Sequence, residues 1–339
     1  MVTLRQVAER AGVSIKTVSR IVNGDPAVNA KTRIAVQQHL HALNYVPNHA
    51  ARMMRGGDSS VYGFMTDAVA TTPYSVDLVR GAQTALKQMN KTLLIANTDG
   101  DPALEKKYWQ MFRAHRVDGV IYASMFHRAH VVGEPDFKGS IVLANCFANA
   151  ADRPSVIPDD EAGGYAQAEY LLKRGHRRIG LMTLISGIEA TRLRGIGVRR
   201  AHQEAGVQFD ESLDQLGIEG TVRQETMVAF EKTVEMLKSP DRPTAIICGN
   251  DTVATQVYYA AGHVGLKIPH DVSIIGFDDQ KLISENLRPS LTTVALPYFD
   301  IGRIAVETIR DAKHNDQQWA PKILVPCPVV ERESCRAIL

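Results

Sequence analysis

The sequence lacks the features that mark membrane or exported proteins. No run approaches the roughly 18 to 20 consecutive apolar residues of a membrane span. The opening residues MVTLRQVAERAG carry charges where a secretory signal needs an apolar stretch. Cysteine is scarce, and the four present are far apart and show neither a C-x-x-C pattern nor Cys/His ligand spacing. We therefore expect a cytoplasmic protein without metal or other cofactor, whose cysteines are reduced packing residues: Cys146, Cys248, Cys327 and Cys335.

Catalytic motifs are also missing. The chain contains no nucleophile elbow, no phosphate loop and no set of metal ligands. Its adjacent carboxylates, Asp159 with Asp160 and Asp278 with Asp279, could act as an acid and base pair. Neighbours in sequence seldom converge on one site, so the sequence predicts a protein that is not an enzyme.

Charge is unevenly divided along the 339 residues. Residues 1–57 carry eight Lys or Arg and two Asp or Glu, a local charge of +6, and the remaining residues carry 31 against 35, a local charge of −4. A basic segment on a slightly acidic body indicates a polyanion partner for the first segment alone. The length suits a small domain plus a large or bilobed one.

Apolar periodicity divides the chain in the same way. From Thr3 to Tyr45 the apolar residues recur at helical spacing, which predicts three short helices. From Val61 onward, apolar runs such as Thr92-Leu-Leu-Ile-Ala and Val272-Ser-Ile-Ile-Gly-Phe alternate with helical stretches, as in parallel sheets with crossover helices. About nine or ten strands are more easily divided between two sheets than held in one. The predicted fold class is α/β, with an all-α N-terminal headpiece and a two-lobed domain of doubly wound parallel sheets.

The headpiece has the pattern of a helix-turn-helix. Thr3-x-x-Gln6 is a capping box, Gly12 suits a sharp turn after the first helix, and Ser14 caps the second. Small Ala8 lets the two helices approach, and the first turn of the second helix then projects outward. Base contacts are predicted from Ile15, Lys16 and Arg20, and phosphate contacts from Thr3, Ser14, Thr17 and Ser19. The alternative for such spacing is a three-helix bundle used for protein contacts.

Several separate motifs then follow in a recognisable order. They are TLRQVAERAGVSIKTVSRIVNG, LNYVPNHAARMM, Val117-Asp-Gly-Val-Ile, Gly175-His-Arg-Arg-Ile-Gly, Ile268-Pro-His-Asp-Val-Ser-Ile-Ile-Gly-Phe-Asp-Asp and Pro289-Ser-Leu-Thr-Thr-Val. With these motifs the chain resembles the lactose-repressor/galactose-repressor (LacI/GalR) family over its whole length. The resemblance implies a DNA-binding transcriptional regulator whose operator affinity is controlled by a small molecule.

The resemblance also implies a hinge over residues 47–60, after a headpiece of residues 1–46. A helix from His49 to Arg55, capped by Asn48, is too short to be stable alone in water. In the family, paired hinge helices fold in the DNA minor groove and wedge apolar side chains into a base step. Met54 matches the wedge position, where the family usually has leucine; the alternative is that Met54 packs the hinge onto the body. Minor-groove contacts are expected from Asn48, Ala51, Arg52 and Met54.

The body resembles periplasmic sugar-binding proteins of the ribose type, in which two α/β lobes clamp a ligand at the carboxyl ends of their strands. We expect one lobe from residues 61–157 with 291–322 and the other from 158–290 with 323–339. A guanidinium and a carboxylate at strand ends can hold adjacent hydroxyl groups of a sugar or sugar-like metabolite. Effector contacts are predicted from Tyr74, Asn145, Arg192, Asn250 and Asp278.

Two of these effector assignments have alternatives. Arg192 has the family's usual spacing to Gly195, but Arg194 also precedes that glycine. Asn250 could equally cap the helix that follows it. Asn145 stands where many relatives have an acidic residue, and Ile196 replaces the family's aromatic residue. These departures prevent the effector from being named by analogy.

The expected partners are double-stranded DNA with a palindromic operator, a small-molecule effector and a second copy of the chain. The C-terminal residues lack a leucine heptad series, which favours a homodimer over a tail-assembled tetramer. Release of repression by an inducer is the leading mechanism, and a corepressor that strengthens DNA binding would use the same parts. A sugar-binding protein without a DNA role is a further alternative, against which the basic headpiece argues.

Overall fold

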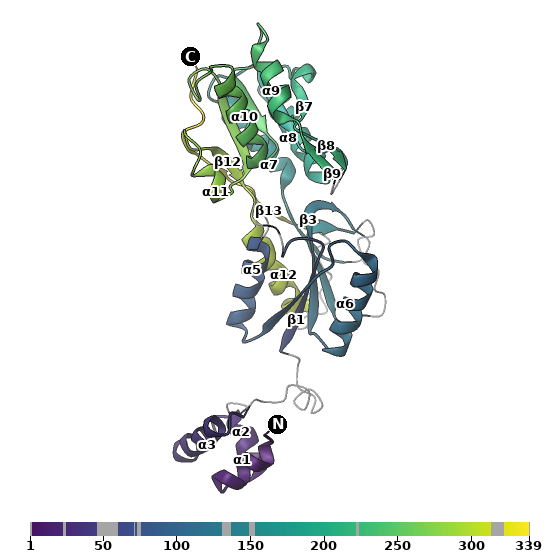
Figure 1. Cartoon of the computed structure of the whole chain (residues 1–339), viewed down its shortest axis with the longest axis vertical. Helices are drawn as coiled ribbons and strands as arrows, with labels where there is room; N and C mark the ends of the chain where they lie inside the picture. The colour runs from purple at the N-terminus through teal and green to yellow at the C-terminus, as the bar shows by residue number, and fades with distance from the viewer. Residues whose placement is uncertain are drawn as a thin grey trace. The chain divides into compact units, whose positions relative to one another are not determined.

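The computed structural model describes residues 2–22, 25–45, 60–70, 72, 76–130, 137–148, 153–221, 224–312 and 322–338. The chain forms two compact units, residues 1–59 and 60–339 (Figure 1), each of which is described by itself below. No helix in the described ranges is long and apolar enough to cross a bilayer. All four cysteines are free, and Cys146, Cys248 and Cys327 are buried, which confirms their packing role.

The headpiece unit contains three helices, as predicted: α1 (Leu4–Ala11), α2 (Ile15–Val22) and α3 (Ala30–Ala42). The capping box is present, because the Gln6 amide donates to Thr3 Oγ1 at 3.3 Å and the Thr3 amide donates to Gln6 Oε1 at 2.9 Å. Gly12 ends α1 at φ +65°, a conformation that glycine adopts without strain. Ser14 Oγ accepts from the Thr17 amide at 3.1 Å and so caps α2.

One small core holds these three helices together. It contains Val7 and Ala8 of α1, Val18 and Ile21 of α2, and Val36 of α3. Because Ala8 is small, α1 and α2 can approach across the turn between them, as the helix-turn-helix pattern requires. The opposite side of α2 remains in solvent.

The first lobe of the large unit is built on a six-stranded sheet in the order β13-β5-β4-β3-β1-β2. Every neighbouring pair in this sheet is parallel. Its strands are β1 (Val61–Thr66), β2 (Thr92–Asn97), β3 (Gly119–Ala129), β4 (Ser140–Phe147), β5 (Ser155–Pro158) and β13 (Lys322–Val325).

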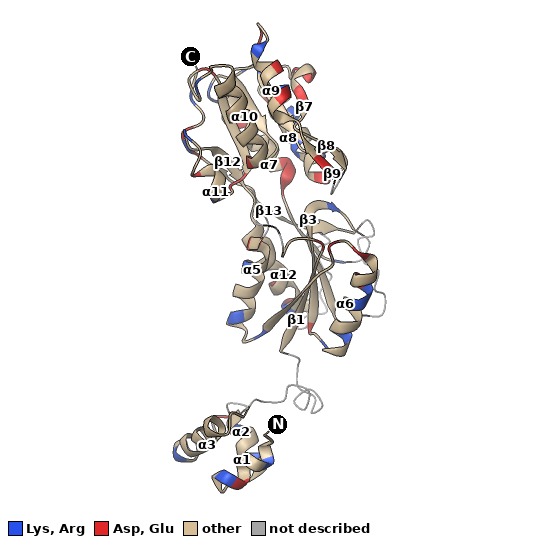
Figure 2. Ribbon diagram, viewed as in Figure 1, with Lys and Arg blue, Asp and Glu red and all other residues tan. Residues whose placement is uncertain are grey.

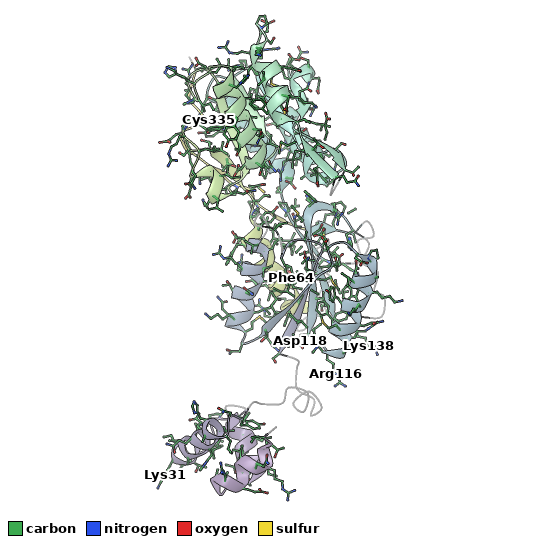
Figure 3. All side chains as sticks on the ribbon, in the orientation of Figure 1. Lys31, Phe64, Arg116, Asp118, Lys138 and Cys335 are labelled. Atoms are coloured by element: carbon green, nitrogen blue, oxygen red, sulfur yellow. The ribbon has the colours of Figure 1, made fainter. Side chains whose placement is uncertain are left out.

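Helices cover both faces of this sheet. On one face α5 (Val76–Gln88) and α12 (Tyr298–Ala312) pack over a core that includes Phe64, which Figure 3 labels. On the other face α6 (Pro102–Ala114) contributes Trp109 and Phe112 to a second core. Gly81 lets α5 and α12 touch, because a β-carbon there would lie 1.9 Å from the Phe299 carbonyl oxygen.

The second lobe repeats this architecture with the sheet order β14-β12-β11-β10-β6-β7, in which only β14 is antiparallel to its neighbour. One face is covered by α7 (Asp160–Leu172) and α8 (Glu189–Glu204), the other by α9 (Ala229–Lys238) and α10 (Asp251–His263). Short α11 (Lys281–Ser284), the 3-10 turn η1 (Glu211–Leu213) and the hairpin of β8 (Ile218–Thr221) and β9 (Gln224–Met227) complete the lobe. The sheet strands are β6 (Ile179–Thr183), β7 (Asp214–Leu216), β10 (Ala245–Cys248), β11 (Ser273–Asp278), β12 (Thr292–Ala295) and β14 (Val329–Val330).

The predicted two-sheet division is correct, but the strand number and two lobe boundaries are wrong. The two six-stranded sheets and the hairpin exceed the nine or ten strands expected, because β5, β7 and the later short strands are too brief to give a clear apolar run. Residues 292–295 pair with β11 in the second lobe, and residues 322–325 pair with β5 in the first. The chain therefore crosses between lobes after β5, after β12 and after β13.

Candidate functional site

The headpiece presents one exposed face on α2. Ile15, Lys16 and Arg20 are exposed, while Val18 and Ile21 on the same helix are buried in the core. Ile15 keeps 48% of its surface in solvent, beside the exposed Lys16 and Arg20. One apolar side chain beside two long donors suits contact with a thymine methyl group and with guanine acceptors.

Basic residues of the headpiece are not confined to this face. Figure 2 marks basic residues on the headpiece helices α1 and α3. Arg20 Nε lies 3.2 Å from Asp25 Oδ2, but a half-exposed pair of this kind contributes only about 0 to 1 kcal/mol and is easily exchanged for another acceptor. The structure gives Thr3 and Ser14 a capping role, and Thr17 Oγ1 lies 2.9 Å from Ser14 Oγ. The phosphate contacts of Thr3, Ser14, Thr17 and Ser19 remain predictions.

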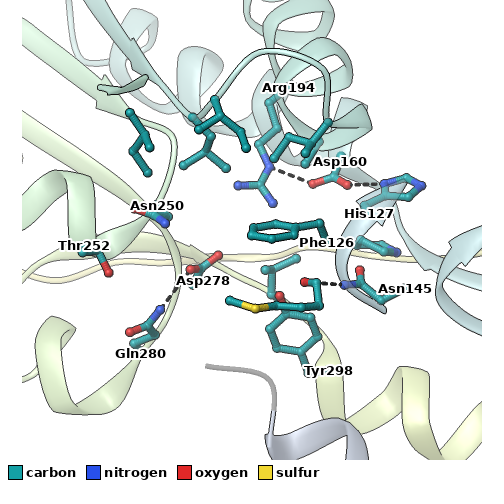
Figure 4. Close-up of a pocket in the computed structure, with 18 of the residues that line it drawn as sticks. Phe126, His127, Asn145, Asp160, Arg194, Asn250, Thr252, Asp278, Gln280 and Tyr298 are labelled. Carbon is teal, nitrogen blue, oxygen red and sulfur yellow. Dashed lines mark hydrogen bonds and ion pairs between the residues drawn. The ribbon is translucent and has the colours of Figure 1, made fainter. Parts of the chain in front are cut away.

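A cavity of about 260 Å³ lies where strand ends of both lobes meet (Figure 4). In such α/β folds the carboxyl ends of parallel strands form the ligand crevice. Polar and apolar groups alternate around it. From the first lobe it is lined by Met125, Phe126, His127, Asn145 and Tyr298. From the second lobe its polar lining is Asp160, Arg194, Glu225, Asn250, Thr252, Asp278 and Gln280.

An irregularity in β3 positions the first-lobe residues. The register between β3 and β4 shifts between Ala123 and Arg128, and Met125 to His127 lie in this shift. Asn145, at φ +55°, donates from Nδ2 to the carbonyl oxygens of Ser124 at 2.9 Å and Met125 at 3.1 Å. Its amide thus supports the backbone where the hydrogen-bond ladder between β3 and β4 is interrupted. The register shift turns the Met125 to His127 segment toward the cavity. Asn145 lines the cavity, as predicted, and also has this structural role.

Arg194 is the central charged group of the cavity. It comes from α8 and is 7% exposed. Its Nε donates to Asp160 Oδ1 at 2.7 Å, its Nη1 donates to the Gly249 carbonyl oxygen at 2.5 Å, and its guanidinium lies 3.5 Å from the centre of the Phe277 ring. The other oxygen of Asp160 lies 2.6 Å from His127 Nδ1, so one carboxylate connects groups of both lobes.

The charges of this cluster stabilise one another. Burial alone would raise the pKa of Asp160, but Arg194 and His127 outweigh it and hold that pKa below its ordinary value. Burial likewise opposes the charge of Arg194, yet Asp160 and Asp278 raise the pKa of the guanidinium above its ordinary value. Both partners are therefore ionised at neutral pH.

The assignment of Arg192 to the cavity is wrong, and Arg194 takes that place. Arg192 points to the outer side of α8, where it is ion-paired with Glu189 at 2.5 Å and its side chain is 58% exposed. It lines a neighbouring cavity of similar volume together with Lys322. The physical reason is helical periodicity: Arg194 falls on the buried stripe of α8, and Arg192, two residues earlier, points elsewhere. Ile196 is 39% exposed and is not among the lining residues.

Asn250 and Asp278 line the cavity, as predicted. Asn250 is also the N-cap of α10, because its Oδ1 accepts from the Val253 amide at 2.8 Å. Asp278 ends β11 at φ +111°, a strained conformation for a non-glycine residue, and accepts from Gln280 Nε2 at 3.1 Å. Burial raises the pKa of Asp278 to about 7 and that of the neighbouring Asp251 well above its ordinary range.

We expect effector affinity to weaken as the pH falls through about 7. An ionised Asp278 accepts hydrogen bonds from ligand hydroxyl groups, and protonation removes part of this capacity. Because the ionised fraction of a group with a pKa near 7 falls about tenfold between pH 8 and pH 6, about tenfold is the largest fall in affinity that this group can cause over that range. Titration calorimetry at several pH values, with a carbohydrate that the protein binds, measures this change in affinity. An Asp278→Asn control should lose the dependence, and a flat profile in the wild type would refute the role.

Several lining residues were not predicted. Tyr74 lies outside the described residues, so its predicted role stays a prediction. Phe126 and His127 follow the predicted strand that begins at Gly119, so the strand-end rule could have found them. Tyr298, at the start of α12, gave no such signal. In the sequence, Asp160 stands out only as one of two adjacent carboxylates. The other, Asp159, is the N-cap of α7. Within the described residues, no group of three or more His, Cys, Asp or Glu could hold a metal ion.

Comparisons with known proteins agree with both parts of the chain. Residues 3–48 match the model of bacterial regulatory proteins of the lacI family, and residues 168–335 match that of the periplasmic binding protein-like domain. The chain is 32% identical to the sucrose operon repressor of Shigella flexneri, over 98% of this chain and 99% of that protein.

Solved structures give the same match. A LacI-family regulator from Rhizobium etli is 42% identical with a TM-score of 0.78, covering 82% of this chain and 99% of that one. A lac repressor dimer bound to operator and the anti-inducer ONPF is 26% identical with a TM-score of 0.78, covering 99% of each chain.

Proposed function

This chain belongs to the lacI family of bacterial regulatory proteins, and we propose that it is a transcriptional repressor whose operator affinity changes when a small molecule binds between its lobes. Members of this family are DNA-binding regulators and not enzymes, in agreement with the expectation from the sequence. The effector is a sugar or a sugar-like metabolite, which is supported by the polar residues at the strand ends of the cavity and by the relative that represses a sucrose operon.

The observation that carries the DNA-binding role is the division of α2 into two sides. Val18 and Ile21 hold the helix in the headpiece core, which leaves Ile15, Lys16 and Arg20 exposed together. A helix held in this way can enter the major groove with its first turns against base edges. Selection of bound duplexes from a random DNA pool tests this. The expected result is a two-fold symmetric sequence, and recovery of no preferred sequence would contradict it.

We expect Arg20→Ala to lose about 1 to 3 kcal/mol of discrimination at one position of each operator half-site, because it removes a base-edge donor. Non-specific binding should fall less. Titrations of the selected operator and of random DNA at one salt concentration measure both effects. If both DNAs weaken by the same factor, Arg20 is a phosphate contact instead.

The hinge is part of the proposal, although its residues lie outside the described part of the chain. Asn48, Ala51, Arg52 and Met54 are proposed to contact the minor groove, with Met54 as the apolar wedge. Folding of so short a helix is expected only on DNA. Amide hydrogen exchange of residues 48–55 with and without operator measures it, and protection without DNA would contradict it.

Coupling between the two sites follows from their shared free energy. A ligand that changes the angle between the lobes also changes the separation of the two hinge helices in a dimer. Effector binding then changes the affinity for operator, and operator binding changes the affinity for effector by the same factor. Tyr259 on α10 and Leu282 on α11 are exposed apolar side chains of the second lobe, and we propose that a second copy of the chain covers them. We propose that the effector is an inducer, which lowers operator affinity and so releases repression. Operator titrations with and without ligand show whether the ligand lowers or raises operator affinity, and sedimentation measures the oligomeric state.

A further inference from the structure

The charged groups that line the cavity between the lobes are mostly acidic. Among the described lining residues, Arg194 is the one Lys or Arg, and it stands against the carboxylates of Asp160, Glu225 and Asp278. Arg192 and Lys322 do not line this cavity; they line a neighbouring one, with which it shares His127, Pro158 and Asp160. The described lining of the cavity therefore has no surplus of positive charge with which to bind an anion.

The one guanidinium is also already engaged by a carboxylate of the chain itself. Asp160 comes from the first turn of α7, directly after the cap residue, and its side chain is fully buried against Arg194. Gly249 takes a second bond from the guanidinium, and Phe277 covers one of its faces. Carboxylates and phosphates bind arginine best when two of their oxygens accept from two guanidinium nitrogens at once. Asp160 already takes one of these nitrogens, Nε. Nη2 has no hydrogen-bond partner among the described residues, which leaves one nitrogen for a ligand.

Apolar groups form the rest of the wall. Leu184, Ile185 and Ile188 follow β6, and Ile218 of the hairpin and Phe126 of the first lobe pack against their cluster. The ring of Tyr298 adds to the lining (Figure 4). Such a wall suits the carbon-bound hydrogens of a sugar ring, while Asn250, Asp278 and Gln280 accept and donate to hydroxyl groups. The apolar side chains of this wall cannot replace the hydration shell of a phosphate or a carboxylate.

We infer that the effector is an uncharged carbohydrate, and that Asp160 excludes sugar phosphates and sugar acids by occupying the place on Arg194 where their anionic group would bind. An added anion in this buried site would meet Asp160 and Asp278 at short range, where repulsion is only weakly screened. The inference rests on the proposed function, because it assumes that this cavity is the effector site.

The full-length protein is tested first, by thermal shift and calorimetry with matched sets of probes. Each set holds a neutral hexose or disaccharide, its 6-phosphate and its uronic acid. A neutral member should raise the melting temperature, and its two anionic partners should bind at least tenfold more weakly. An anionic member that binds more tightly than its neutral partner overturns the inference, as does a panel in which no neutral carbohydrate binds. Operator selection on the same preparation shows separately whether the DNA-binding role fails.

Asp160→Asn then tests the excluding residue, since it keeps the shape of the side chain and removes its charge. The preference for the neutral member should shrink at least tenfold, and sulfate should raise the melting temperature of the variant but not of the wild type. Asp159→Asn is the matched control, because Asp159 Oδ1 caps α7 through the Ala162 amide at 3.1 Å and asparagine caps equally well. An unchanged preference in Asp160→Asn would overturn the role of Asp160. If that variant does not fold, the wild-type panel still decides the inference.

Discussion

Arg194→Ala is expected to weaken effector binding at least tenfold and to lower the free energy of unfolding by about 3 to 5 kcal/mol, which is the usual cost of removing one partner of a buried ion pair. The substitution leaves Asp160 buried with His127 as its remaining side-chain partner, and it leaves the Gly249 carbonyl without the guanidinium. Urea unfolding measures the stability, and titration with a carbohydrate that binds the wild type measures the affinity.

Arg192→Ala is the matched control for this experiment. It removes the same type of side chain from the same helix, but from an exposed pair with Glu189, which contributes about 0 to 1 kcal/mol at most. Both stability and effector affinity should stay close to those of the wild type. If Arg192→Ala loses the effector and Arg194→Ala keeps it, the effector does not bind in the cavity between the lobes.

This pair of arginines also shows how far the sequence could predict the site. A buried stripe runs along α8 through Ala190, Arg194, Val198 and Ala201, at intervals of three and four residues. Helical periodicity alone would therefore have chosen Arg194. The usual distance in the family between the cavity arginine and the following glycine favours Arg192. That prediction fails because distance along the chain does not determine which side of a helix faces the cavity.

Helix caps and turns are predicted correctly from the sequence, because neighbouring residues determine them. The capping box of Thr3 and Gln6, the turn at Gly12 and the cap at Ser14 all depend on residues within one helical turn. Asp160 could not be found in this way, since its partners Arg194 and His127 come from other elements and distant parts of the sequence. The lobe crossings at β12 and β13 were misplaced for a similar reason, because strand pairing across a sheet depends on contacts that a local pattern does not contain.

Val18→Asn is expected to unfold the headpiece and to abolish specific operator binding. Val18 of α2 is fully buried in the headpiece core, which contains five buried side chains in the described part of the chain. Losing its apolar burial costs about 1.5 to 3 kcal/mol, and burying an amide without partners adds roughly 1 to 3 kcal/mol. A domain of this size is stable by about 2 to 7 kcal/mol, at 0.05 to 0.15 kcal/mol per residue, so the substitution removes most or all of that stability.

Ile34→Asn is the control, because it makes the same type of change on α3 at a side chain that is 57% exposed. It should leave the headpiece folded and operator affinity near that of the wild type. Amide NMR spectra report headpiece folding, and operator and random-DNA titrations at one salt concentration report binding. Effector-induced stabilisation of residues 60–339 should persist in both variants, since the headpiece has its own core and forms a separate unit. If Val18→Asn unfolds the headpiece and still binds operator as the wild type does, DNA binding does not depend on the headpiece. If Ile34→Asn loses binding with a folded headpiece, the DNA-reading face must be sought on α3.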